Sequence, residues 1–222
     1  MKIIPAITSL FVLGVGITAL ADPSGPDKRN ILPNGGFETW TPLPDPPAGK
    51  ARPHLEEEKM PNGFTPSIEG AEPDGEIGIT ISPDSTIKHE GNYSVRIEST
   101  HGEQVGAVSL REVEVEPHTR YRVKVWMRGE GISSFAGGGV VLWTHFGPEE
   151  GYWSSPTSVR QNYKPTTSSG TFDWAPYEFT LETGADTRRL RVILQLRRAT
   201  GTVWFDQLEI IPEGEADNAP GF

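Results

Sequence analysis

The most constraining feature of this sequence is a two-residue period of apolar and polar side chains that begins near Glu76. Such an alternation puts apolar side chains on one face of a strand and polar side chains on the other. Strands of this kind form antiparallel sheets that bury one face each, and two such sheets pack as a sandwich. The alternating runs lie at residues 77–81, 93–97, 112–116, 121–128, 140–146, 177–181, 190–197 and 202–210.

Glycine, proline and asparagine stand between these runs and predict the turns. The turn signals lie at residues 90–92, 116–118, 129–131, 183–186 and 200–201. About eight or nine strands in one domain predict a jelly-roll β-sandwich. Residues 41–75 are instead rich in proline, glycine and glutamate, and we expect a long ordered loop there, with room for one short strand.

The composition excludes several classes of function. The 222 residues include no cysteine, which excludes disulfides, thiolate zinc sites, iron–sulfur clusters and cysteine nucleophiles. There are 30 Asp and Glu against 20 Lys and Arg, and the formal net charge is −10. This balance argues against nucleic-acid binding, because neutralising phosphates requires clustered Lys and Arg. The length suits a single all-β domain with a core of its own.

Residues 1–21 are typical of a secretory signal peptide. Lys2 gives a basic start, an apolar stretch follows, and Ala19 and Ala21 are small residues where a signal peptidase needs them. The alternative is a membrane anchor, but the stretch is at the short limit for a spanning helix and Pro5 interrupts it. We therefore expect a secreted or periplasmic protein without a membrane span in its mature chain. Its expected parts are a signal peptide at 1–21, a leader at 22–30, a sandwich module at 31–212 and a flexible C-terminal tail at 213–222.

Several short segments, taken in order, carry a resemblance to a known family. They are Asn-Gly-Gly-Phe-Glu at 34–38, Gly-Asn-Tyr-Ser-Val-Arg-Ile at 91–97, the strand at 121–129, Gly-Thr-Phe-Asp-Trp at 170–174 and the strand at 201–210. Together they resemble the carbohydrate-binding modules grouped with families four and nine, which are galactose-binding-like β-sandwiches. The resemblance covers residues 31–212 and rests on scaffold motifs, so it implies a secreted, non-catalytic module for a polysaccharide or oligosaccharide without naming the sugar.

The resemblance also implies a structural calcium ion at the edge of the sandwich. Glu38 and Asp206 match the family's acidic ligands, and backbone carbonyls near Gly91 and Asn92 would complete the shell. Calcium takes six to eight oxygen ligands of these types. Gln207 stands where the family often has a second acid, which lowers the expected affinity. The alternative is that Glu38 and Asp206 only hydrogen-bond the two ends of the domain.

Outward aromatic and polar side chains predict the sugar-binding face. Sugars stack their C–H faces on Trp or Tyr, and planar polar groups hydrogen-bond their hydroxyls. If the strand at 121–128 buries Val125 and Met127, its other face turns Trp126 and Arg128 outward. The same reasoning applies to the strands at 140–146 and 190–197. We expect the three strands to share one concave face with Trp126, Arg128, Trp143, His145, Gln195 and Arg197, and Tyr152 and Trp153 to form its lip from the long connection at 146–172.

Each outward tryptophan has a competing interpretation as a core or rim residue, because Trp is seldom fully exposed. Trp40, Trp174 and Trp204 lie within the scaffold segments, and we expect them to serve packing.

No catalytic constellation stands out in the sequence. A glycosidase needs two carboxylates across a cleft, whereas Glu149 and Glu150 are adjacent and diverge on an extended chain. We therefore expect a non-catalytic monomer whose partner is a glycan and neither a nucleic acid nor a membrane. The competing hypothesis is a structural or protein-interaction sandwich of the bacterial envelope that binds no sugar. A weaker one is a small polysaccharide-degrading enzyme on the same scaffold.

Overall fold

The computed structural model describes residues 29–43, 59–70, 77–149, 159–165 and 168–215. Within these ranges the regular structure is strand throughout, and no helix there is long and apolar enough to cross a membrane. The predicted all-β class is confirmed. The strands are β1 (Trp40–Pro42), β2 (Lys59–Pro61), β3 (Phe64–Glu69), β4 (Ile79–Asp84), β5 (Ser94–Ser99), β6 (Val105–Leu110), β7 (Val113–Glu114), β8 (Thr119–Gly147), β9 (Val159–Tyr163), β10 (Gly170–Glu182) and β11 (Arg189–Glu215).

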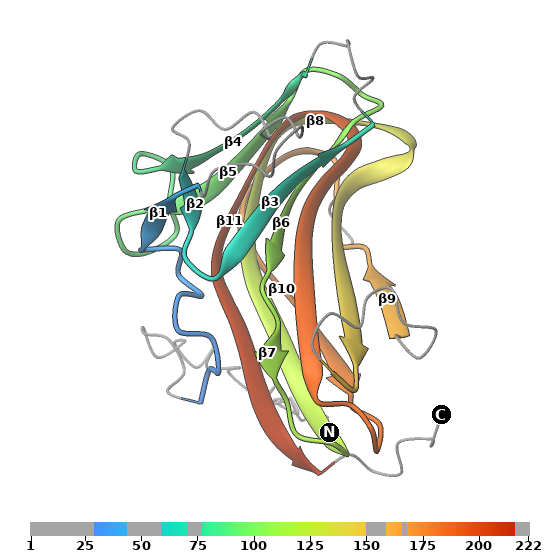
Figure 1. The fold of residues 1–222 in the computed structure, drawn as a ribbon. Helices are drawn as coiled ribbons and strands as arrows, with labels where there is room; N and C mark the ends of the chain where they lie inside the picture. Colours follow the sequence, from blue (N-terminus) through green and yellow to red (C-terminus); the bar gives the residue numbers. More distant parts are fainter. Residues whose placement is uncertain (1–28, 44–58, 71–76, 150–158, 166–167, 216–222) are drawn as a thin grey trace, which may run out of the picture.

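Two long strands, β8 and β11, organise the fold (Figure 1). The first arm of β8, residues 119–132, pairs with β10 and with the second arm of β11, residues 201–215. The second arm of β8, residues 139–147, pairs with β9 and with the first arm of β11, residues 189–197. Each long strand therefore contributes to two groups of strands.

We name these groups by one edge strand each. The β10 layer contains β10, the first arm of β8, the second arm of β11, β5 and β4. The β9 layer contains β9, the second arm of β8, the first arm of β11, β6 and β3. The strands β1 and β2 form a separate small sheet, and β7 pairs with the start of β11.

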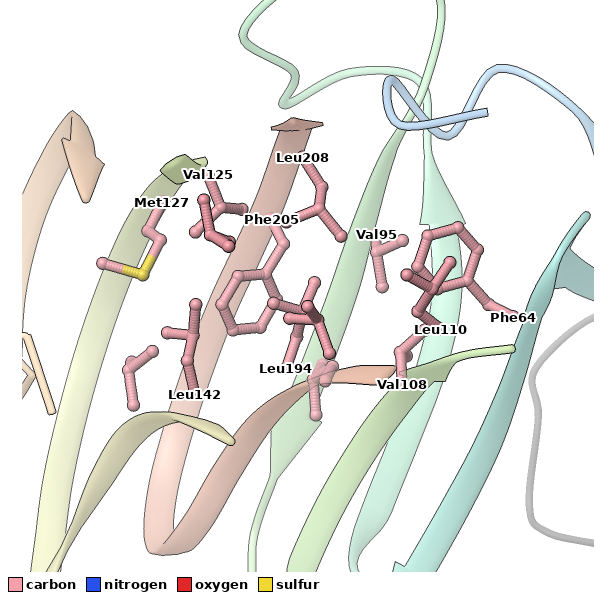
Figure 2. Close-up of a cluster of buried hydrophobic side chains, with 14 of the residues drawn as sticks. Phe64, Val95, Val108, Leu110, Val125, Met127, Leu142, Leu194, Phe205 and Leu208 are labelled. Carbon is pink, nitrogen blue, oxygen red and sulfur yellow. The ribbon is translucent and has the colours of Figure 1, made fainter. Parts of the chain in front are cut away.

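The core lies between the two layers (Figure 2). Val125 and Met127 from the β10 layer face Leu142 and Leu194 from the β9 layer, and Phe205 lies among them. All of them are buried. The inner faces thus pack on each other as in a β-sandwich, which confirms the predicted jelly roll. Because inward side chains of the two layers meet, their outward side chains point in opposite directions.

The strands change layer at glycine bends. Gly201 has a φ of +105°, and a Cβ there would lie 2.6 Å from the carbonyl oxygen of Gly131. Only glycine fits such a close approach with this backbone conformation. The sequence predicts strand-ending turns at 129–131 and 200–201, and this prediction is wrong, because β8 and β11 continue through both positions. The bends carry the pairing from one layer into the other.

Residues before β1 run beside the last strand. The Ile31 N–H donates to the Ile210 carbonyl at 3.0 Å, and the Leu208 N–H donates to the Gly35 carbonyl at 2.8 Å. At the other end, β11 continues to Glu215, whose backbone pairs with Thr119, three residues beyond the expected end of the module. The predicted signal peptide and most of the predicted leader lie outside the described residues.

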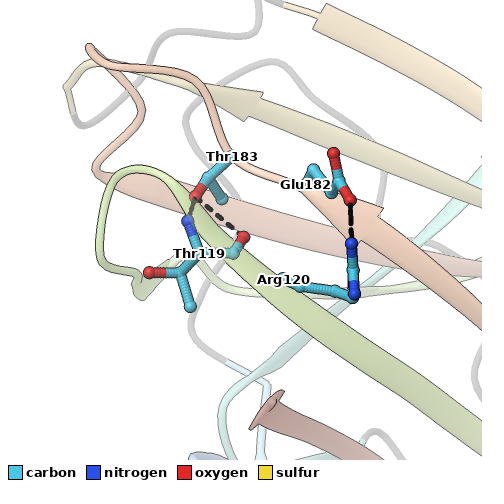
Figure 3. Close-up of polar contacts among 4 residues, drawn as sticks. All are labelled: Thr119, Arg120, Glu182 and Thr183. Carbon is cyan, nitrogen blue, oxygen red and sulfur yellow. Dashed lines mark hydrogen bonds and ion pairs between the residues drawn. The ribbon is translucent and has the colours of Figure 1, made fainter. Parts of the chain in front are cut away.

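Polar contacts join β8 and β10 where both strands reach one end of the β10 layer (Figure 3). The Thr119 N–H donates to the Thr183 hydroxyl at 2.9 Å, and the Thr183 N–H donates to the Thr119 carbonyl at 3.0 Å. Arg120 Nη2 lies 2.9 Å from Glu182 Oε1. These contacts fix the register between the first arm of β8 and β10.

The sequence analysis did not predict β6. All six residues of β6 are buried, so the segment shows no alternation. β3 lies within residues 41–75, where the sequence allowed one short strand in a long loop, and it pairs with β6 along its whole length. These two strands complete the β9 layer.

Candidate functional site

The outward face of the β10 layer is packed by its own side chains. Trp126 stacks on His89 with ring centroids 3.8 Å apart and planes inclined by 16°. The Arg128 guanidinium lies 5.7 Å from the centre of the Trp204 ring. Trp204 in turn donates its indole N–H to Asp84 Oδ2 at 2.9 Å. The aromatic rings of this face therefore have partners within the protein.

The outward face of the β9 layer carries the remaining predicted site residues that the structure describes. We call it the Trp143 face, and it consists of Trp143 and His145 from β8 with Gln195 and Arg197 from β11. Trp143 pairs with Ile193 across the two strands, so Gln195 is its diagonal neighbour on the same face. The Arg197 guanidinium lies 5.9 Å from the centre of the Trp143 ring.

On the Trp143 face, the indole nitrogen of Trp143 and the side-chain oxygen of Gln195 are buried and have no hydrogen-bond partner. Gln195 is only 6% exposed. A buried polar atom without a partner costs about 1–3 kcal/mol, so native structures seldom leave one unpaired without a reason. The pair combines one donor with one acceptor on neighbouring strands.

The small residues of β6 border this face and were missed by sequence reasoning. Ala107 pairs with Gln195, Ser109 pairs with Ile193, and both are buried outside the core cluster. Val141, on the other side of Gln195, is also buried. No sequence signal marked β6 as part of the site, because it lacks alternation.

The expectation of one shared face for three strands is wrong. Trp126 and Arg128 lie on the β10 layer, whereas Trp143, His145, Gln195 and Arg197 lie on the β9 layer. The two sets face away from each other because β8 bends between Arg128 and Trp143. The predicted lip residues Tyr152 and Trp153 lie outside the described residues.

The two acidic residues of the predicted calcium site meet the same loop before β5. Asp206 Oδ2 accepts hydrogen bonds from the N–H groups of His89 at 2.8 Å and Glu90 at 3.1 Å. The Glu38 carboxylate accepts one from the Asn92 N–H and one from its side-chain amide, each at 2.9 Å. The fold therefore gathers both carboxylates from distant parts of the chain.

Burial of Asp206 disfavours the charged form of its carboxyl group. Burial raises the pKa of Asp206 to about 6, and repulsion from Glu38 acts in the same direction, while backbone N–H groups oppose it. The residues fit calcium in ligand type, since both side chains offer carboxylate oxygens. In the described residues no three His, Asp or Glu side chains are grouped so that they could hold a metal ion, so the remaining ligands would be backbone carbonyls or water.

No family model matches the sequence, and no curated protein matches it. Among solved structures, the enzymatically active domain of bacteriophage CBA120 tailspike protein 4 has a TM-score of 0.55 and 11% identity over 83% of this chain and 21% of that chain. A cyclase from Fischerella sp. TAU, in complex with 4-(1H-indol-3-yl)butan-2-one, has a TM-score of 0.52 and 14% identity over 84% of this chain and 98% of that chain. TmCBM61, in complex with β-1,4-galactotriose, has a TM-score of 0.47 and 18% identity over 83% and 99%.

These similarities bear on the fold alone, because the sequence identities are so low. The tailspike domain and the cyclase support the β-sandwich, and the TM-score of TmCBM61 is too low to add an argument. The chain spans only 21% of the tailspike chain, so the activity of that protein does not transfer. The implied grouping with families four and nine is not shown.

Proposed function

We propose that this protein is a non-catalytic module that binds a polysaccharide or oligosaccharide on the Trp143 face. The observation that carries the proposal is the buried, unpartnered pair of Trp143 Nε1 and Gln195 Oε1. A sugar hydroxyl both donates and accepts, so adjacent hydroxyls satisfy an indole N–H and an amide oxygen together. The free protein already bears the free-energy cost of burying these two atoms without partners. A ligand that hydrogen-bonds them removes that cost, which favours binding.

The other members of the face suit the same class of ligand. The Arg197 guanidinium lies over the Trp143 ring and presents planar donors, and the partly exposed ring adds an apolar surface for the C–H face of a sugar. A few placed polar groups around an aromatic surface are the usual composition of small-ligand sites.

A non-catalytic role follows from the chemistry of the same face. None of the four residues that define it carries a carboxylate, whereas glycoside hydrolysis uses a pair of carboxylates. Binding without turnover is therefore the function that these side chains support.

The proposal includes a calcium ion held by Glu38 and Asp206. The cation would offset the charge of two carboxylates that the fold brings to one loop. We expect calcium to raise the midpoint of thermal unfolding of the wild-type chain and to have little effect on Asp206→Asn. An equal response of both proteins would contradict this assignment.

We further propose that the chain is exported after cleavage behind Ala21 and acts as a monomer. Both statements rest on the sequence. The mass of the protein recovered outside the cytoplasm tests the cleavage, and sedimentation tests the oligomeric state.

The direct test is binding of the intact chain to a panel of polysaccharides and oligosaccharides in calcium-containing buffer. We expect the protein to bind a specific glycan. Trp143→Ala and Gln195→Met should each weaken this binding about tenfold or more, which corresponds to a loss of about 1.4 kcal/mol in binding free energy. Trp126→Phe, which keeps a ring against His89, serves as the matched control and should bind as the wild type does.

Two outcomes would overturn the proposal. One is an equal loss of binding in Trp126→Phe and Trp143→Ala. The other is no glycan binding by a chain shown to be folded, which would favour the structural or protein-interaction alternative.

A further inference from the structure

A pocket lies at the small β1–β2 sheet, away from the Trp143 face. Its volume is about 360 Å³, and its lining residues are Glu38, Thr39, Trp40, Lys59, Pro83 and Tyr93. None of them belongs to β8 or β11, the strands that carry the Trp143 face. The volume is at the lower end of the range for small-molecule sites, roughly 300–1,000 Å³.

The walls of this pocket are held in place by hydrogen bonds. Trp40 donates its indole N–H to the Phe37 carbonyl at 2.6 Å, which fixes the ring. The Asn34 amide donates to the carbonyls of Thr39 and Asn62, each at 3.0 Å, and its oxygen accepts from the Thr39 N–H at 3.0 Å. A ligand would therefore meet a formed site with little ordering to do on binding.

Tyr93 gives the pocket an aromatic side chain that the core does not use. Among the described residues, the large hydrophobic side chains left exposed are Tyr93 at 37% and Phe135 at 60%. A single exposed aromatic is ordinary on a protein surface. Tyr93, however, lines the same pocket as Trp40, so two aromatic rings border one hollow.

The charges of the pocket are mixed. Glu38 is held by the Asn92 N–H and side-chain amide, while Lys59 brings an ammonium group and Thr39 a hydroxyl. A strongly anionic ligand would meet Glu38, and a strongly cationic one would meet Lys59. A neutral ring with several hydroxyls offers acceptors to the ammonium and an apolar face to Tyr93 or Trp40.

We propose that this pocket is a second binding site, which takes one neutral sugar unit or the end of a short glycan. Its volume is of the size that a mono- or disaccharide fills. The site does not depend on the Trp143 face, and each of the two proposals can fail without the other.

The experiment follows the indole N–H signal of Trp40 by ¹H–¹⁵N NMR on the intact chain in calcium-containing buffer. Trp40→Phe assigns the signal, and the probes are glucose, galactose, mannose and xylose at millimolar concentration. We expect at least one of them to shift the signal saturably. Tyr93→Ala should weaken that binding about tenfold. Lys59→Met, which keeps the length of the side chain and removes its charge, should weaken it severalfold.

Phe135→Ala is the matched control, because it removes the other exposed aromatic side chain. It should leave the response unchanged, as should Trp143→Ala. The proposal is overturned if none of the probes shifts the Trp40 signal, if Tyr93→Ala and Lys59→Met both respond as the wild type does, or if Trp143→Ala abolishes the shift. Polysaccharide binding that depends on Trp143 while the Trp40 signal stays silent would leave the first proposal standing and remove this one.

Discussion

The outward faces of the two layers carry similar residues and differ in the contacts of their tryptophan side chains. On the β10 layer, Trp126 stacks on His89, and Trp204 donates its indole N–H to Asp84. On the β9 layer, the indole nitrogen of Trp143 and the amide oxygen of Gln195 have no partner. An outward tryptophan alone therefore does not distinguish the two faces, whereas the hydrogen bonding of its indole N–H does.

Charged residues of the β10 layer also form ion pairs with one another. Arg122 Nε lies 3.1 Å from Glu213 Oε1, and Arg122 Nη1 lies 3.7 Å from Glu178 Oε2. Partly exposed ion pairs of this kind contribute little stability, roughly 0–1 kcal/mol. These ion pairs do occupy the charged groups that a ligand would contact, which is consistent with a structural role for the outward face of the β10 layer.

The largest effect should come from the core that both layers share. Phe205 is fully buried between them, and Phe205→Ala should lower the free energy of unfolding by about 3–5 kcal/mol. Urea unfolding measures this loss. Thr180→Ala, at an exposed position of β10, is the control and should change stability by less than about 0.5 kcal/mol. A loss below about 1 kcal/mol in Phe205→Ala would mean that the layers do not depend on a common core.

The next effect concerns pH and the β10 layer. The folded-state pKa of Asp206 is about 6, above its ordinary value of 3.8, so the folded state binds this proton more tightly than the unfolded state. The stability that this proton provides is fully present below pH 3.8 and is lost as the pH rises through about 6.

With calcium removed by a chelator, the folded state should lose about 3 kcal/mol of stability as the pH rises from 3.8 to about 6, because one pKa unit corresponds to about 1.4 kcal/mol. The stability difference between wild type and Asp206→Asn should therefore change with pH in this direction, and denaturant unfolding at pH 4, 5, 6 and 7 measures it. A difference that stays constant across this range would contradict the assignment.

A smaller effect tests the satisfied indole of the β10 layer. Trp204→Phe removes the donor to Asp84 and leaves that carboxylate short of a partner. We expect a loss of about 1–2 kcal/mol in unfolding free energy, with glycan affinity unchanged. Weaker glycan binding in this variant would break the contrast between the two faces.

The smallest expected effect is an increase in stability. Gln195→Met removes a buried acceptor that has no partner and keeps the side chain near its original size. We expect it to stabilise the free protein by about 1 kcal/mol while it weakens glycan binding. Thermal unfolding and binding measured on the same preparation test both halves. A destabilised variant would show that Gln195 serves the fold.

Sequence reasoning performed best where the alternation was strict. Val123, Val125 and Met127 are buried as predicted, with Trp126 and Arg128 turned to the other side of the strand. It failed for β6, because a strand buried on both faces has no alternation to detect. Trp40 packs against the core as predicted, but no sequence signal indicated that Trp40 and Tyr93 line one pocket at the β1–β2 sheet.

The sequence by itself determined the all-β class, the inward and outward sides of the strictly alternating strands, and the acidic residues that meet at the loop before β5. These follow from local backbone geometry, in which successive side chains alternate, and from short motifs. Only the tertiary structure decided which outward residues share a face. That depends on the bends near Gly131 and Gly201, which move β8 and β11 from one layer to the other and so separate Trp126 from Trp143. The alternation of apolar and polar residues along a strand does not indicate the layer to which the strand belongs, because long-range strand pairing determines the layer.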